Sequence, residues 1–568
     1  MTVPEPLHLT TDVLVIGSGG AGMYAAIEAA RADRQVLLAD RSLIGRSGAT
    51  VMAMMTVAVA LGSDGPDDPA YHFADTLASG RGLCDEDLAR LLCDEGPDCI
   101  LEMDRWGVGW ARNGDAIRAA HAPGHDRPRC VYVDFLNTGP AVSKTLRKVL
   151  HNHEDNIRRV GDLLIVDLIK SAGAVTGAVA VEISTGRTVT IAAPATIIAT
   201  GGLTRLFRRS SAAFNMGGDG FALALRAGAR LIDMEFVQFF PIGHLAPRLI
   251  GLDPIMWDPF RYKLGGRLLN ADMEEFTERY GTAEEGRYVI TRDAATYAIT
   301  KEVAAGRGTP HGGAYLSFMH LSEKELKDAF GPVIDKLAAN GIDLTRMPVE
   351  VAPIAHYHMG GIAVNTRMET AVPGLLAAGE AVGGANGANR LSGNAITEAL
   401  VFGRRAGRTA ADRSAAGGRA VDKVAAADAL RLVEAAGDPR PIPNTAAMIA
   451  ELQAAMSDHA GPFKTAGSLA RATAVLDDLD ARLGNAPPGT PGVYDPVRID
   501  WFDLRNMLLV ARTVVSAAAN RTESRGAHQR EDFPGLLEEW TLNQFIRLED
   551  GRPIVEKGAR RDVKEFVG

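Results

Sequence analysis

The segment from residue 11 to residue 40, TDVLVIGSGGAGMYAAIEAARADRQVLLAD, restricts the fold of this chain more than any other. Its apolar run at 13–16 is typical of a buried strand, the alanine-rich part predicts a helix, and QVLLAD predicts a second, parallel strand. Gly17, Gly19 and Gly22 form GxGxxG between the first strand and the helix. The first two glycines allow a tight turn and a close approach of the backbone to a pyrophosphate, and the third lets the helix pack on the strand. We therefore predict a Rossmann-like dinucleotide-binding unit.

Asp40 ends the second predicted strand, about where an acidic residue accepts a ribose hydroxyl. The phosphates of the dinucleotide would lie at the positive end of the helix. FAD and NAD share this fingerprint, so these residues alone leave both cofactors open. The segments PATIIATGG at 194–202 and PGLLAAGEA at 373–381 predict further buried strands, and Glu380 in the second could contact the cofactor.

Composition limits the other classes of function. The chain has 568 residues, which at about 150 residues per domain is too long for one core. Its net charge of -9 and the lack of a basic patch argue against nucleic acid or anionic lipid as a partner. Four cysteines without CxxC spacing indicate a reducing compartment and predict no metal site and no iron–sulfur cluster on this chain. Neither a secretory leader nor an 18-residue apolar run is found, so we expect a cytoplasmic location and no direct membrane insertion.

Nine motifs follow one another along the chain in a recognisable order. They are GSGGAG at 17–22, RSGAT at 46–50, ATGG at 199–202, GDG at 218–220, DMEFVQF at 233–239, TRD at 291–293, AHYHMGGI at 355–362, GANRLSGNA at 387–395 and RTESRGAHQRED at 521–532. In these motifs the chain resembles the fumarate reductase and succinate dehydrogenase flavoprotein family, which includes L-aspartate oxidase. The resemblance implies an α/β fold with a Rossmann-like FAD-binding domain in two pieces, 1–240 and 350–440. It also implies an α+β capping domain inserted at 241–349 and a helical C-terminal domain at 441–568.

The same resemblance implies that FAD is the cofactor. The residues expected to contact it are Gly17, Ser18, Gly19, Gly20, Ala21, Gly22, Asp40, Arg41, Ser47, Gly48, Ala49, Thr50, Ala199, Thr200, Gly201, Asp219, Glu380, Arg390, Ala395 and Ile396. Family members that bind FAD covalently use the histidine of an RSHT sequence, where this chain has Gly48. Because glycine cannot form that bond, noncovalent FAD is expected. Since covalent attachment generally raises the potential of a flavin, its absence argues against efficient oxidation of succinate.

Three residues match the family's catalytic positions. The resemblance implies that Arg292, in TRD, donates or accepts the proton of the reaction, and that His356 and Arg390 hold a substrate carboxylate, the guanidinium by a two-pronged contact. Without the resemblance, an ion pair of Arg292 with Asp293 and a structural role for His356 would be the plainer interpretations. The charges of RTESRGAHQRED are interpreted as a structural network between domains, so its Arg525 and His528 are not predicted to be catalytic.

The stretch FVQFFPIGHL, residues 236–245, departs from the family sequence FVQFHPTG. Phe240 and Ile242 stand where the resemblance expects a histidine and a threonine that help to hold a second carboxylate. Asp258 and Pro259 stand where it expects a Thr-Glu pair. A carboxylate in an unpaired apolar pocket costs several kcal/mol. The predicted substrate-binding residues are therefore His356, Arg390, Phe240, Ile242 and Asp258, with one carboxylate site and an apolar distal pocket.

Repositioned recognition of a dicarboxylate stays open as an alternative. The cations that could supply it are Arg248, Arg261, Lys263, Arg267 and His244. The predicted reaction is hydride transfer between FAD N5 and the α,β-carbons of a monocarboxylate with an apolar distal part. Two other functions stay open: an FAD oxidase similar to L-aspartate oxidase, and an electron-transfer subunit whose partner carries iron–sulfur clusters.

Overall fold

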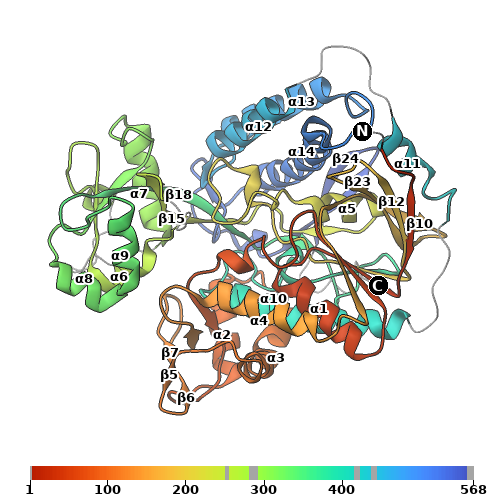
Figure 1. Ribbon diagram of the computed structural model, residues 1–568. Helices are drawn as coiled ribbons and strands as arrows, with labels where there is room; N and C mark the ends of the chain where they lie inside the picture. Colours follow the sequence, from red (N-terminus) through yellow and green to blue (C-terminus); the bar gives the residue numbers. More distant parts are fainter. Residues whose placement is uncertain (1–2, 250–254, 281–291, 415–421, 436–443, 559–568) are drawn as a thin grey trace.

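The strand–turn–helix segment at the start of the chain lies in the middle of a five-stranded parallel sheet. The computed structural model describes residues 3–249, 255–280, 292–414, 422–435 and 444–558 (Figure 1). The central sheet has the order β20 (Leu375–Ala377), β13 (Ala195–Ile198), β2 (Val13–Ile16), β3 (Val36–Ala39) and β9 (Ile157–Val160). Val13 pairs in parallel register with Val36 on one side and Ala195 on the other. The apolar runs predicted to be buried strands are therefore neighbours in one sheet.

Two helices cover this sheet through unusually close backbone contacts. They are α1 (Gly20–Arg31) and α10 (Asn394–Ser414). A Cβ atom added to Gly22 would lie 1.9 Å from the carbonyl oxygen of Gly17, and one added to Gly403 would lie 2.4 Å from that of Ala21. Because real Cβ contacts are never this short, only glycine lets α1 approach both the turn and α10.

Further sheets and helices surround the centre. One sheet has the order β1 (Leu7–Thr10), β12 (Thr188–Ala192), β11 (Ala174–Glu182) and β10 (Leu163–Ser171). Helices α2 (Pro69–Ser79), α3 (Glu86–Arg105) and α4 (Thr138–His151) lie in the lower part of Figure 1, away from β10 and β12 at the right. The short strands near them are β4 (Thr56–Ala58), β8 (Cys130–Tyr132) and β7 (Ala119–Ala120), and the pair β5 (Arg112–Asn113) and β6 (Ala116–Ile117).

An inserted unit projects from the body of the molecule (green in Figure 1). It is connected through the long antiparallel strands β15 (Val237–Ala246) and β18 (Val349–His358), which continue into β17 (Ala314–Ser317) and β16 (Arg267–Leu269). Its helices are α6 (Asp258–Leu264), α7 (Arg292–Ala304), α8 (Glu323–Phe330) and α9 (Pro332–Ala339). Trp257, Phe260 and Phe318 lie in its own hydrophobic core. The predicted boundaries at 241 and 349 fall inside β15 and β18, so both strands belong to the body at one end and to the inserted unit at the other.

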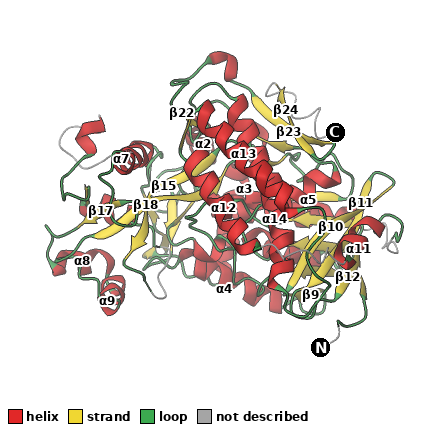
Figure 2. Cartoon of the chain, turned by 90° about the horizontal axis from the view of Figure 1, so that it is seen from above, coloured by secondary structure: helices red, strands yellow, loops and turns green. Residues whose placement is uncertain are grey.

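The C-terminal region combines helices with a hairpin. Its helices are α11 (Ala427–Glu434), α12 (Thr445–His459), α13 (Ala466–Leu483) and α14 (Pro496–Asn520), and α14 lies near α5 (Asp219–Ala227) in Figures 1 and 2. The hairpin of β23 (Asn543–Glu549) and β24 (Arg552–Gly558) joins β14 (Leu231–Ile232) and β19 (Gly361–Ile362) in one sheet. Leu231 pairs with Ile546 in this sheet. The last strands of the chain are thus part of the body, which a purely helical C-terminal region would not provide.

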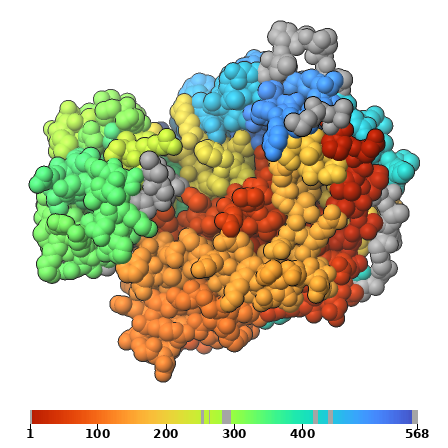
Figure 3. All heavy atoms as spheres, in the orientation of Figure 1, coloured from red at the N-terminus to blue at the C-terminus, as the bar shows by residue number. Residues whose placement is uncertain are grey.

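Among the described residues, no helix is both long enough and apolar enough to cross a membrane. In the surface view, residues from the first part of the chain lie in a hollow between the yellow and orange segments, next to the inserted unit (Figure 3).

Candidate functional site

A large cavity lies at the carboxyl ends of the central strands. This edge is where ligands of open α/β sheets bind. The empty space is about 1600 Å³ including the open mouth. Its wall contains the turn at 17–21, residues 47–56 and 163–165, the segment 199–201, and residues of β18 and α10. Nearly every predicted cofactor residue lines it; Gly22 instead packs against the turn beneath.

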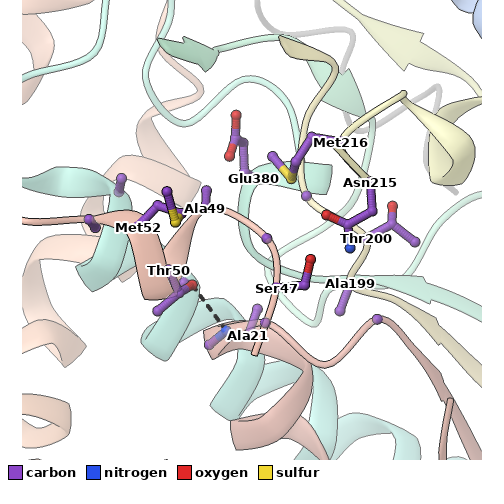
Figure 4. Close-up of a pocket in the computed structure, with 18 of the residues that line it drawn as sticks. Ala21, Ser47, Ala49, Thr50, Met52, Ala199, Thr200, Asn215, Met216 and Glu380 are labelled. Carbon is purple, nitrogen blue, oxygen red and sulfur yellow. Dashed lines mark hydrogen bonds between the residues drawn. The ribbon is translucent and has the colours of Figure 1, made fainter. Parts of the chain in front are cut away.

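The glycine turn presents backbone to the cavity. Gly17 has φ +101°, a conformation that favours glycine, and Gly19 caps α1 without a side-chain hydrogen bond. A Cβ added to Gly19 would meet only Thr50 Oγ1 at 3.9 Å, so little covers this position. The Gly20 N–H donates to Thr50 Oγ1 at 3.1 Å, the dashed line in Figure 4. A helix N-terminus with exposed backbone suits a pyrophosphate.

Asp40 is held by four hydrogen bonds. Its Oδ2 accepts from the Ser18 N–H at 2.8 Å and the Ser18 hydroxyl at 2.6 Å. Its Oδ1 accepts from the Ser42 N–H and hydroxyl, both at 2.8 Å. An ionised carboxylate offers about four lone-pair sites, so these donors use its capacity. Asp40 lines the cavity, but in this arrangement it fixes the turn, and a ribose hydroxyl would have to displace one of the serine donors.

Arg41 and Asp219 connect the cavity wall to the C-terminal region. The Arg41 guanidinium makes a two-pronged contact with Asp503 of α14, at 2.6 and 2.9 Å, and lies 3.4 Å from Asp219. Asp503 also accepts from Arg205 at 2.7 Å. The two arginines hold the pKa of the buried Asp503 below its usual range although burial opposes this shift. The network therefore ties α14 to the cofactor side of the cavity.

Two buried polar atoms on the wall have no protein partner among the described residues. They are Thr200 Oγ1 and Asn215 Oδ1. Figure 4 shows Thr200 and Asn215 on one side of the pocket, with Ser47 near Thr200 and with Ala49 and Thr50 on the other side. A Cβ added to Gly48, at φ +84°, would meet nothing within 4 Å. Open space beside Gly48 and unsatisfied polar groups elsewhere on the same wall fit a large polar cofactor such as FAD.

His356 and Arg390, the pair predicted to bind a carboxylate, both line the cavity. His356 Nδ1 and Ser211 Oγ are 2.8 Å apart. Arg390 donates to Gln238 Oε1 at 3.1 Å, and its guanidinium carbon lies 4.4 Å from the ring centre of Tyr357. The arginine is thereby held on an aromatic face at the cavity wall, where a carboxylate can reach it.

Apolar groups lie next to this pair. The ring of Phe240 is edge-on to the ring of His356, with centroids 4.1 Å apart at 74°. Phe240 also packs with Met256 and Ile354. The cavity is further lined by Met52, Met54, Met55 and Met216, of which Met52 and Met216 are labelled in Figure 4. Methionine side chains are adaptable and polarizable, so this wall favours an apolar ligand group.

The other predicted substrate residues lie elsewhere. Ile242 packs in the core of the inserted unit, and Asp258 is buried at the start of α6. Neither is among the described residues that line the cavity. Residues two apart on a strand normally share a face, but the pairing of β15 with β18 is irregular between Phe240 and Gly243. This irregularity separates Phe240, on the cavity, from Ile242, in the inserted unit.

Arg292 is the first residue of α7, and its side chain lies outside the described part of the chain, as do those of Pro259 and Lys263. His244 is engaged by Trp257 Nε1, which donates to its Nδ1 at 3.1 Å, and Arg267 pairs with Glu275 at 3.5 Å. Among the described residues that line the cavity, the arginines are Arg41 and Arg390. Arg248, Arg261 and Arg267, the cations considered for a second carboxylate, do not line it.

His358 and the motif at 521–532 make structural contacts. His358 is buried, its Nε2 lies 3.1 Å from the Met234 carbonyl oxygen, and burial lowers its pKa to about 4, so the ring is neutral at neutral pH. In the motif at 521–532, Arg521 pairs with Glu235 at 2.7 Å and Arg525 with Glu523 at 2.6 Å, all buried. None of these residues lines the cavity, which agrees with the interpretation of this motif as an internal network.

Sequence reasoning missed Asn215, Ser211, Tyr357 and the methionines. Asn215 has a usable signal, because it lies in the loop AAFNMGG between the ATGG and GDG motifs. Met52, Met54 and Met55 lie within four residues of one another, and Met216 follows Asn215 in the same loop.

Comparisons with known proteins cover almost the whole chain. Residues 12–396 match the model of an FAD binding domain, and residues 449–557 match that of the fumarate reductase flavoprotein C-terminal region. The chain is 35% identical over 533 residues to one of the subunits of the fumarate reductase (CoM/CoB) of Methanothermobacter marburgensis, covering 93% of this chain and 95% of the relative. It is 34% identical to the L-aspartate oxidase of Streptomyces coelicolor, with 96% and 93% covered. The structure of Mycobacterium smegmatis Sdh1 in complex with UQ1 superposes with a TM-score of 0.88 at 35% identity, with 97% and 95% covered.

Proposed function

Because the chain belongs to the fumarate reductase and succinate dehydrogenase flavoprotein family, we propose that this FAD-dependent oxidoreductase acts on a carboxylate whose distal part is apolar. The reaction is hydride transfer between flavin N5 and the α,β-carbons of that acid. The proposed cofactor is noncovalent FAD, because Gly48 cannot form a bond to it.

The contact of Phe240 with His356 is the observation that carries this proposal. It places an aromatic ring 4.1 Å from the imidazole that would hold the carboxylate. Met256 and Ile354 pack with Phe240, and Met256 also lines the cavity. A second carboxylate here would lose its hydration without a described cation on this side of the wall, which costs several kcal/mol. An aliphatic or aromatic group would instead gain about 1.5–3 kcal/mol by burial.

The roles of the protein groups follow from their positions. Arg390 supplies a two-pronged contact to the substrate carboxylate, and its place on Tyr357 orients the guanidinium. His356, held by Ser211, donates a further hydrogen bond to the same carboxylate. When bound, FAD supplies the acceptor or donor of the hydride. Arg292, at the start of α7 in the inserted unit, is proposed to donate or accept the proton at the neighbouring carbon.

A partner for electron transfer is a second part of the proposal. The similar protein from Methanothermobacter marburgensis is named as a subunit of a fumarate reductase. A second similar protein, from Coxiella burnetii and 31% identical to this chain, is named as the flavoprotein subunit of a succinate dehydrogenase. A C-terminal region of the fumarate reductase flavoprotein type at 449–557 supports a similar role here. We propose an iron–sulfur protein as that partner. An oxidase like L-aspartate oxidase is the alternative, and release of hydrogen peroxide during aerobic turnover would distinguish it.

Anaerobic stopped-flow spectroscopy tests the proposed chemistry. The flavin of the FAD-loaded protein is followed while it is reduced by saturated acids, or reoxidised by unsaturated ones, across matched mono- and dicarboxylates such as cinnamate and fumarate. The proposal expects faster flavin turnover with the aromatic monocarboxylate. Fumarate or succinate reacting faster than every monocarboxylate would contradict it.

A further inference from the structure

At the cavity wall lies a buried cluster of acids that the proposed reaction does not use. Its members are Glu380 in the short helix η4 (Gly379–Ala381), Glu398 in α10 and Tyr357 in β18. Glu380, Tyr357 and Arg390 line the cavity, and Glu398 lies one contact deeper. The Tyr357 hydroxyl donates to Glu398 Oε2 at 2.7 Å. Tyr357 thus touches Glu398 with its hydroxyl and Arg390 with its ring face.

The remaining contacts of the two carboxyl groups are neutral. Asn386 Nδ2 donates to Glu398 Oε2 at 2.5 Å, and the backbone N–H of His358 donates to Glu380 Oε1 at 3.1 Å. Glu398 Oε1 is buried without a hydrogen-bond partner among the described residues. An ionised carboxylate would need partners for both oxygens, so this environment suits a protonated carboxyl group.

The charges around the cluster do not balance if both carboxyl groups are ionised. The groups that act on Glu380 are Glu398, Arg390 and the His358 N–H, and those that act on Glu398 are Tyr357, Asn386 and Arg390. His358, next to Tyr357, is neutral at neutral pH. Two carboxylates against one arginine leave a net negative charge in a buried place, and a substrate carboxylate at Arg390 would add another. Burial disfavours every unpaired charge.

We propose that Glu380 and Glu398 share one proton in the resting FAD-loaded protein, and that binding of a carboxylate at Arg390 draws a second proton into this pair. The second half rests on the proposed function, because it requires the carboxylate site at Arg390. Among the groups named here, one carboxylate offsets the charge of Arg390 at rest, and the substrate carboxylate offsets it when bound. Glu398 is thereby a positioning residue that acts through Tyr357 on Arg390.

The titration behaviour of the pair supports this assignment. Burial raises the pKa of Glu380 to about 8 and the pKa of Glu398 to about 7. The nearby charge of Glu398 adds to the rise in the pKa of Glu380. Between these values the pair holds about one proton, and below both values it holds two. Burial also raises the pKa of Tyr357 well above its usual range, so its hydroxyl keeps its proton and stays a donor to Glu398.

Calorimetry measures the linked proton directly. Cinnamate is titrated into the FAD-loaded protein in buffers of different ionisation enthalpy, at a pH near 7.5 and again near 5.5. We expect uptake of close to one proton per bound cinnamate at the higher pH and close to none at the lower, where the pair is already filled. Glu398→Gln should reduce the uptake at the higher pH. The control Glu302→Gln removes a buried glutamate that pairs with Arg307 in the inserted unit and should leave it unchanged.

Infrared difference spectroscopy of the FAD-loaded protein without any acid tests the resting proton separately. A pH step across the range from 6 to 9 should show a protonated carboxyl band that disappears on ionisation and is altered in Glu398→Gln. Absence of such a band, or proton uptake that does not depend on pH, would overturn the proposal that Glu380 and Glu398 share one proton. If neither cinnamate nor fumarate binds, the carboxylate site and the linked uptake both fail, while the infrared band still decides whether the pair stores a proton.

Discussion

Phe240 and His356 lie on neighbouring strands with their rings edge-on, 4.1 Å between centroids. They come from β15 and β18, the two strands that join the body to the inserted unit. The contact therefore brings together an apolar wall, the histidine proposed to bind a carboxylate, and the two strands that join the inserted unit to the body.

The flavin should separate from the polypeptide on denaturation. Gly48 replaces the residue that could bond to FAD, and the space beside it is open. After acid precipitation, all the yellow colour should remain in the supernatant, as measured by its absorbance and by mass spectrometry of the protein. Flavin that stays with the precipitate would contradict noncovalent binding.

Thr200→Val should weaken FAD binding without destabilising the apoprotein. The Thr200 hydroxyl has no partner in the described protein, so its loss removes only a contact to the cofactor, worth about 0.5–1.5 kcal/mol. Titration of apoprotein with FAD measures the affinity, and thermal unfolding measures the stability.

Thr196→Val is the matched control for this change. Thr196 also has a buried hydroxyl without a described partner, and it lies on β13 near Thr200 but outside the cavity wall. It should leave FAD affinity unchanged. Equal losses of affinity in both variants would assign the effect to the sheet rather than to the cofactor site.

Arg292→Lys should keep FAD bound and slow turnover by several orders of magnitude. Lysine keeps the charge but lacks the planar fork and the reach of arginine, so a role in proton transfer is lost while the fold is kept. Rates are compared at matched flavin content with those of Arg248→Lys, a change at an exposed arginine of the inserted segment. Near-normal turnover of Arg292→Lys would indicate that Arg292 has no role in proton transfer and only forms a structural ion pair with Asp293.

Glu398→Gln should change how stability depends on pH. Burial raises the pKa of Glu398 from 4.5 to about 7, so the folded protein holds a proton that the unfolded chain has released between these values. Its contribution to stability is complete below pH 4.5 and is lost as the pH rises toward 7, at up to about 1.4 kcal/mol per pH unit. Glutamine does not titrate, so the variant does not lose this stability. The free energy of unfolding of Glu398→Gln minus that of the parent, measured by denaturant unfolding, should therefore increase from pH 4.5 to about 7. Parallel curves would show that Glu398 does not titrate there.

The cofactor half of the site follows closely from the sequence. The glycine turn, the strands on either side and the α/β class depend on local patterns, and the family assignment, the FAD cofactor and the fold class are confirmed. The ribose contact that the spacing of Asp40 suggests stays a prediction; in this structure Ser18 and Ser42 donate to its oxygens. The serine two residues after Asp40 is a local sign of that alternative.

The substrate half depends on packing that no short segment encodes. Phe240 and Ile242 are two residues apart and share one apolar pattern, but the irregular pairing near Gly243 sends them to different cores. Glu398 and Tyr357 are 41 residues apart and meet only because α10 and β18 converge on the cavity. Such pairs leave no periodic signal in one sequence, so the acid cluster became visible only in the structure.

The most direct test of the apolar distal pocket is a ratio of catalytic efficiencies. The kcat/KM for fumarate is divided by that for cinnamate, in the parent and in Phe240→His, at matched flavin content. Ile242→Val serves as control, since Ile242 is buried in the inserted unit. We predict a low ratio in the parent, a ratio at least several-fold higher in Phe240→His, and no change in the control. An unchanged ratio in a folded, flavin-loaded Phe240→His protein would contradict the account.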